Sequence, residues 1–140
     1  MLLVLIKEGV KNMDKSLQDN MPIYMQIMDN VRKSIASGEL KPGMRVASVR
    51  ELAGEFEVNP NTMQRALNEL EREGLLISER TSGRFVTEDV ELIRKLRMQM
   101  ANEAAKRFQK EMSVLGYSKN EMTDFFLKGL DDYEQTIEAS

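Results

Sequence analysis

The chain has 140 residues, no cysteine, no histidine and a formal net charge of −3, with 41% hydrophobic and 31% charged residues. This composition is that of an ordinary globular protein of one or two small domains. The absence of cysteine and histidine excludes disulfides, thiolate nucleophiles, Cys/His zinc sites and histidine acid–base catalysis. Because the net charge is negative, any basic surface must be a local cluster of residues.

Residues 1–21 form an N-terminal extension of uncertain structure. Its apolar run, Leu2 to Ile6, is too short to span a membrane. It has no basic region before it and no small-residue cleavage site after it, so it is not predicted to be a signal peptide. We therefore expect a cytoplasmic protein with no membrane contact.

The first predicted helix begins at Pro22 and ends before Gly38, since proline suits a first helical turn and glycine the position past the end. Its apolar stripe has helical spacing: Tyr24, Ile27, Met28, Val31 and Ile35. Pro42-Gly43 then predicts a turn, and the apolar residues around it favour a very short strand.

Two short helices are predicted next. The first opens with a capping box, Ser48-Val49-Arg50-Glu51, and its buried stripe is Val49, Leu52, Ala53 and Phe56. Glu57-Val58 must be a tight turn, because Asn59 and Pro60 are a cap and first residue for another helix. That helix ends at Gly74 and has the inner stripe Met63, Ala66, Leu67 and Leu70. The pair predicts a helix-turn-helix.

A β-hairpin is predicted after the second of these helices. Leu75–Ser78 and Phe85–Thr87 are β-prone, and Thr81-Ser82-Gly83 between them has turn chemistry. Such a hairpin is a wing, so residues 22–87 are expected to form a winged helix-turn-helix domain. The predicted fold class is mainly α with a small β-hairpin.

Residues 88–140 are predicted to form two antiparallel helices, separated at Gly116, with a second capping box at Ser118–Glu121. Each helix has an apolar stripe, and two helices alone cannot bury both. The first domain or a second subunit must therefore cover them. We predict a dimerisation region whose interface residues are Ile93, Leu96, Met100, Phe108, Phe126, Leu130 and Tyr133.

The predicted 59–73 helix has polar side chains on its outer face near its start: Asn61, Gln64, Arg65 and Asn68. Arginine reads guanine and asparagine or glutamine reads adenine, and this end of the helix enters the major groove in helix-turn-helix proteins. Between Lys41 and Arg84 seven basic residues balance seven acidic ones. DNA binding would therefore depend on several arginines converging on one side: Arg45, Arg50, Arg65 and Arg84, the last reaching a minor groove or the backbone.

The stretch from Pro22 to Val86 resembles the winged-helix reader domain of GntR-family bacterial transcription regulators. The resemblance rests on three runs: I-x-x-G-x-L-x-P-G-x-x-x-x-S-x-R-x-L from Ile35, V-N-P-N-T-x-x-R-A-L-x-x-L-E-x-E-G-L from Val58, and the wing end G-R-F-V. The remaining tail is similar to the YtrA-type branch, whose short C-terminal part serves dimerisation.

The resemblance implies that Arg45 and Ser48 meet phosphates and that Arg50 and Arg65 approach bases or backbone. It places Asn61, Thr62 and Gln64 at the groove and makes the wing from Ser82, Gly83 and Arg84. With Asn59, these eleven residues are the predicted DNA-binding set. Many members have Ser-Arg-Thr-Thr where this chain has Asn59-Pro60-Asn61-Thr62, and Pro-Ser where it has Ala47-Ser48.

The resemblance implies a sequence-specific, homodimeric transcriptional regulator, most simply a repressor, that binds an inverted-repeat operator. The genes that it regulates would include its own operon and an adjacent transporter. The chain has no room for the ligand-binding or aminotransferase-like domains of larger branches. No phosphate loop, nucleophile elbow or metal-ligand spacing occurs, so we expect no enzyme activity, metal, cofactor or small-molecule effector. The acidic pI leaves one alternative open, a winged-helix module that pairs with a protein and binds no operator.

Overall fold

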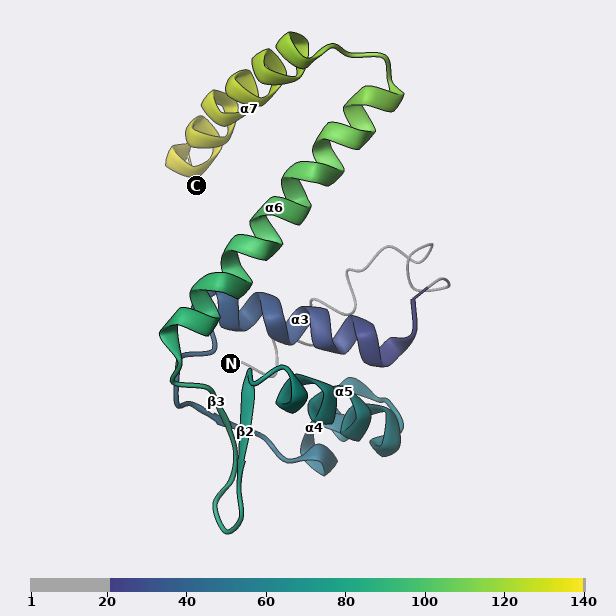
Figure 1. Ribbon diagram of the computed structural model, residues 1–140, viewed down its shortest axis with the longest axis vertical. Helices are drawn as coiled ribbons and strands as arrows, with labels where there is room; N and C mark the ends of the chain where they lie inside the picture. The colour runs from purple at the N-terminus through teal and green to yellow at the C-terminus, as the bar shows by residue number, and fades with distance from the viewer. Residues whose placement is uncertain (1–20, 140) are drawn as a thin grey trace. The chain divides into compact units, whose positions relative to one another are not determined.

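The computed structural model describes residues 21–139, and the expectations for residues 1–20 lie outside them. The chain divides into two compact units, with the boundary between Met98 and Gln99. The first unit contains α3 (Ile23–Ser37), β1 (Arg45–Val46), α4 (Val49–Phe56), α5 (Pro60–Arg72), β2 (Leu76–Glu79), β3 (Gly83–Val86) and the start of α6 (Val90–Val114). The predicted class, mainly α with a small β-sheet, is confirmed (Figure 1).

The helix-turn-helix is built as its capping residues predict. The Ser48 hydroxyl accepts a hydrogen bond from the Glu51 N–H at 3.2 Å at the start of α4. The Asn59 side chain accepts from the Asn61 N–H at 2.7 Å at the start of α5, where Pro60 is the first helical residue. Between them Glu57 takes a left-handed conformation with φ +56°, which turns the chain within a few residues.

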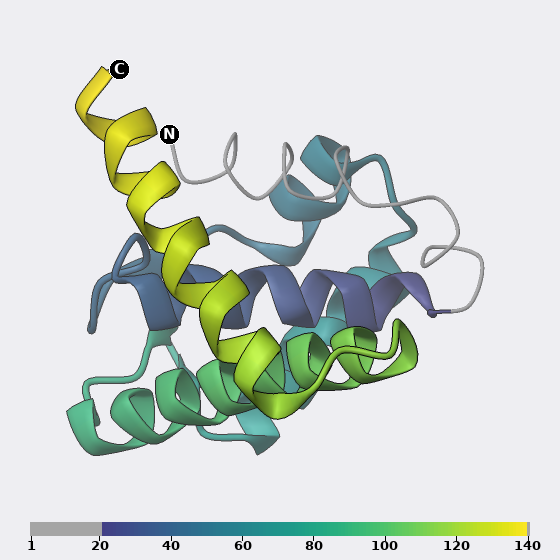
Figure 2. The ribbon, with the colours of Figure 1, turned by 90° about the horizontal axis from the view of Figure 1, so that it is seen from above.

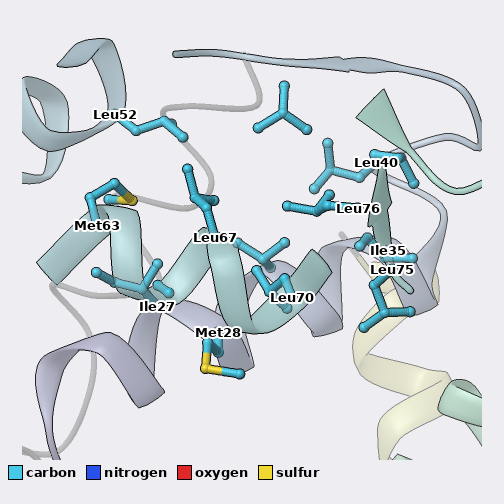
Figure 3. Packing of buried hydrophobic residues seen from close by; sticks show 14 of the residues in the cluster. Ile27, Met28, Ile35, Leu40, Leu52, Met63, Leu67, Leu70, Leu75 and Leu76 are labelled. Carbon is cyan, nitrogen blue, oxygen red and sulfur yellow. The ribbon is translucent and has the colours of Figure 1, made fainter. Parts of the chain in front are cut away.

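The core of the first unit is formed by α3, α4 and α5 together with Leu76 of β2 and Val86 of β3. Figures 1 and 2 show how these helices and strands are arranged. The predicted inner stripe of α5 has no exposed surface: Met63, Ala66, Leu67 and Leu70. Figure 3 shows Met63, Leu67 and Leu70 of α5 together with Ile27 and Met28 of α3 and Leu52 of α4. Because this face of α5 is buried, the opposite face of the helix is the one that is exposed to solvent.

The sheet has three antiparallel strands in the order β1-β3-β2, because the short strand before α4 pairs with the second strand of the wing. Arg45 lies opposite Phe85, and Val46 opposite Arg84. β2 begins one residue later than predicted, since the Leu75 N–H still donates to the Leu70 carbonyl at the end of α5. This pairing brings the β1 residues beside the wing.

α6 continues into the second unit, which also contains α7 (Lys119–Ala139). The predicted capping box is complete: Ser118 and Glu121 each accept a hydrogen bond from the other's backbone N–H. Within this unit Phe108 contacts Phe126 edge-to-face, with ring centroids 6.1 Å apart. No helix among residues 21–139 combines the length and apolar character needed to cross a membrane.

The expected dimerisation residues lie in different environments. Ile93 and Leu96, in the first turns of α6, pack against the core of the first unit. Met100 is half-buried. Phe126, Leu130 and Tyr133 of α7 are 54%, 43% and 61% exposed. Of the expected dimerisation residues, those that the structure leaves exposed are therefore all on α7.

Candidate nucleic-acid interface

The outer face of α5 presents the polar side chains that the sequence places there. Asn61, Arg65 and Asn68 are exposed, and Gln64 is half-buried because its amide donates to the Asn68 side-chain oxygen at 2.7 Å. Thr62 is half-buried. Amide and guanidinium groups at the start of a helix have the donors and acceptors that match base edges in a major groove.

Arg65 is held by an aromatic residue from a different helix. Its guanidinium carbon lies 3.8 Å from the centroid of the Tyr24 ring, and its Nη2 donates to the Tyr24 hydroxyl at 3.2 Å. A cation over a tyrosine ring gains roughly 0.5–1 kcal/mol at an exposed site. Tyr24 belongs to the predicted apolar stripe of α3. Its contact with Arg65 could not be predicted from the sequence, because the two residues are 41 positions apart.

A hollow of about 230 Å³ lies where β1, the start of α4 and the wing meet. Its lining residues are Arg45, Val46, Ala47, Ser48, Ser78, Glu79, Gly83 and Arg84. It is smaller than the roughly 300–1,000 Å³ of typical ligand pockets. The Ser48 hydroxyl accepts a hydrogen bond from the Glu51 N–H, so its own proton can still be donated. Together with the Arg45 guanidinium, this hydroxyl can therefore bind a phosphate group.

Gly83 is required where the wing approaches Arg45. A Cβ atom at this position would lie 3.3 Å from Arg45 Nε, and Gly83 has φ +108°, a value that other residues rarely adopt. Gly83 thus lets the guanidinium of Arg45 lie flat against the wing. Ser82, beside it, is exposed at the hairpin turn.

The three acids at the end of α5 all have arginine partners. Glu69 pairs with Arg72 at 2.6 Å, Glu71 with Nε of Arg84 at 2.6 Å, and Glu73 accepts from Nε of Arg32 at 3.0 Å. The hydrogen bond that Arg32 donates to Glu73, opposed by burial, raises the pKa of Arg32 above its ordinary value. These pairs neutralise the carboxylates that would otherwise repel DNA.

Three arginines from different elements, Arg45 of β1, Arg50 of α4 and Arg65 of α5, have no such partners in the described part of the chain. Among the described residues 21–139, Arg45, Arg50 and Arg65 have no carboxylate within ion-pair distance. All three are exposed. Glu69, Glu71 and Glu73 are therefore paired within the protein, whereas Arg45, Arg50 and Arg65 carry unpaired positive charges, and counterion release by phosphates requires unpaired cations.

Arg84 belongs to the paired group. Its side chain is 15% exposed, and its guanidinium lies against α5, where Nε contacts Glu71 and Nη2 lies 3.4 Å from the Asn68 side-chain oxygen. Its expected contact with a minor groove or the backbone stays a prediction. In the described structure it links the wing to the helix.

Glu71 gives the fold a predictable acid sensitivity. Burial would raise the pKa of Glu71, but hydrogen bonds from Ser78 and Arg84 and the charge of Arg84 lower it below the usual value. A carboxyl with a lowered folded-state pKa stabilises the fold above its unfolded pKa, about 4.3, and loses that contribution as the pH falls through the folded pKa.

The free energy of unfolding of the wild type, measured in urea, should therefore fall below about pH 4.3. The Glu71→Gln variant should lose less stability over the same pH range. Parallel pH curves would contradict this.

Comparisons with known proteins identify relatives that match most of the chain. A family profile described as bacterial regulatory proteins, gntR family, matches residues 23–86. The HTH-type transcriptional regulator YhcF of Bacillus subtilis is 39% identical over 80% of this chain and 93% of its own length. The HTH-type transcriptional repressor YtrA of the same organism is 43% identical over 49% of this chain and 52% of its own.

A solved structure agrees with these sequence relatives. The GntR family transcriptional regulator from Listeria monocytogenes superposes with a TM-score of 0.73 at 38% identity, and the match covers 79% of this chain and 96% of that one. Because this match covers more of the chain than residues 22–87, the similarity extends beyond the winged helix.

Proposed function

The chain belongs to the GntR family of bacterial regulatory proteins, and we propose that it represses transcription as a cytoplasmic homodimer bound to an inverted-repeat operator. Membership of this family makes it a DNA-binding transcriptional regulator. Repression is supported by the similarity of its winged helix to the repressor YtrA. We further propose that it catalyses no reaction, since the members of this family are regulators.

The observation that carries the proposal is that Arg45, Arg50 and Arg65 are exposed and have no carboxylate partner among residues 21–139. The start of α5 enters the major groove with Asn61, Gln64 and Arg65 at base edges, flanked by Asn59 and Thr62. Arg45 and Ser48 bind a phosphate at the hollow beside the wing, and Arg50 binds backbone or base. Ser82 and Gly83 bring the wing's backbone to the next groove.

Selection of bound sites from a random DNA pool tests this function. A two-fold dimer should enrich an inverted repeat whose half-site centres lie about 34 Å, one helical turn, apart. The binding constant of the selected site should fall steeply with salt, because each phosphate contact releases counterions. Failure to enrich any sequence and to bind at low salt would overturn the proposal and favour the protein-pairing alternative.

The dimer is predicted to depend on the exposed apolar residues of α7. Leu130→Glu places a charge among these residues and should convert a micromolar dimer into a monomer in sedimentation experiments, because an unpaired charge at an apolar interface is strongly unfavourable. Gln135→Glu adds the same charge to the same helix and is the matched control. A wild-type protein that sediments as a monomer would contradict the homodimer.

A further inference from the structure

The wing and the base-reading face of α5 are joined by a continuous chain of hydrogen bonds. Glu71 accepts from the Ser78 hydroxyl and from Nε of Arg84, and so holds the guanidinium in place. Nη2 of Arg84 then lies 3.4 Å from the side-chain oxygen of Asn68. That same oxygen accepts the amide N–H of Gln64 at 2.7 Å.

Arg84 determines which groups donate and which accept in this chain of hydrogen bonds. A guanidinium has only donors, so the Asn68 atom that faces Arg84 must be the oxygen and not the amide nitrogen. Because that oxygen faces Gln64 too, Gln64 must turn its amide nitrogen towards Asn68. The guanidinium of Arg84 therefore determines the orientation of both side-chain amides, each of which could otherwise rotate by half a turn.

The hydrogen-bonding groups left free on α5 follow from this orientation. Gln64 retains its carbonyl oxygen and one amide N–H, an acceptor and a donor side by side. Adenine presents the complementary pair in the major groove, the N6 amino group and the N7 acceptor. Asn68 retains only its two amide N–H donors, which suit an acceptor such as guanine O6 or thymine O4.

We infer that Arg84 is a positioning residue for sequence readout, which orients Asn68 and Gln64 so that Gln64 recognises an adenine. This inference rests on the proposed function. Arg84 itself has little surface to offer DNA, because it is 15% exposed and its charge is paired with Glu71. The wing thus contributes to base recognition through α5, in addition to any backbone contact of its own.

Arg84→Met tests the inference, since methionine is unbranched and apolar but donates no hydrogen bond. In random-pool selection the wild type should prefer adenine at one base pair of each half-site by roughly 5- to 150-fold, and the variant should lose most of that preference. The slope of log affinity against log salt should stay unchanged, because no phosphate contact is removed. Asn68→Ala, at an exposed helical position, breaks the chain without altering the wing and should relax the same base pair.

The matched control is Arg80→Met, the same substitution at an exposed wing arginine, which should leave the base preference intact. The double variant Arg84→Met/Asn68→Ala should show no further loss of preference, because both changes act on one chain of hydrogen bonds.

An unchanged adenine preference in folded Arg84→Met and Asn68→Ala would overturn this inference and leave the proposed function standing. A uniform loss of affinity with a salt slope reduced by about one would also overturn it, and assign Arg84 to a phosphate. A wild type that selects no sequence would overturn both the inference and the proposed function.

Discussion

Met63→Ala is expected to lower the free energy of unfolding by about 2–5 kcal/mol, the range for removing a buried methionine side chain from a core. Met63 has no exposed surface and lies on the inner face of α5, between α3 and α4. The loss combines the transfer free energy of the side chain with the cavity that it leaves. Urea unfolding followed by circular dichroism measures it.

Met25→Ala is the matched control for this prediction. Met25 is also helical but is 41% exposed on α3, so the same substitution should change the stability by no more than about 0.5 kcal/mol. If both variants lost the same stability, the core of the first unit would not lie where the structure places it. Met63→Leu, which conserves volume, should recover most of the loss.

Arg65→Ala is expected to weaken binding to the selected operator by about 1–3 kcal/mol, as for an arginine that contacts a base edge. Tyr24→Leu removes both the ring under the guanidinium and the hydroxyl that accepts from it, and should weaken binding by a smaller amount. Tyr24→Phe keeps the ring and should lie between Tyr24→Leu and the wild type. Fluorescence anisotropy with labelled operator at fixed salt gives all three values.

Arg72→Ala controls for the loss of an arginine from the same helix. Arg72 lies two turns after Arg65, is highly exposed and pairs with Glu69, so its removal frees one carboxylate at the far end of the helix and should weaken operator affinity much less than Arg65→Ala. An effect as large as that of Arg65→Ala would place the DNA along the whole of α5. A neutral Arg65→Ala in a folded protein would remove Arg65 from the interface.

Much of the fold was predictable because its signals are local. Ser48, Asn59 and Ser118 cap helices as their spacing indicates, and the inner stripe of α5 is buried completely. Caps and stripes depend on residues at most one or two turns apart, so a sequence shows them directly. The pairing of β1 with β3 depends on residues about forty positions apart, and the sequence indicated only a short strand.

The features of the site that sequence reasoning missed are all contacts between distant segments. Tyr24 contacts Arg65, and Arg32 contacts Glu73, each across 41 residues. Counting seven basic and seven acidic residues could not show which of them neutralise one another. The predicted roles of the DNA-binding residues and of the α7 interface depend on a second molecule, DNA or another copy of the chain, and remain predictions.

The pairing of the acids at the end of α5 has a consequence for the speed of association. Because those acids are paired within the protein, they weaken the positive field of Arg45, Arg50 and Arg65 at the recognition face less than free carboxylates would, despite a net charge of −3. Encounters with DNA in which this face leads should be favoured over others. The association rate constant should then fall with ionic strength for the wild type and less steeply for a variant that lacks Arg45. An acidic protein can in this way be steered to a polyanion by the arrangement of its charges.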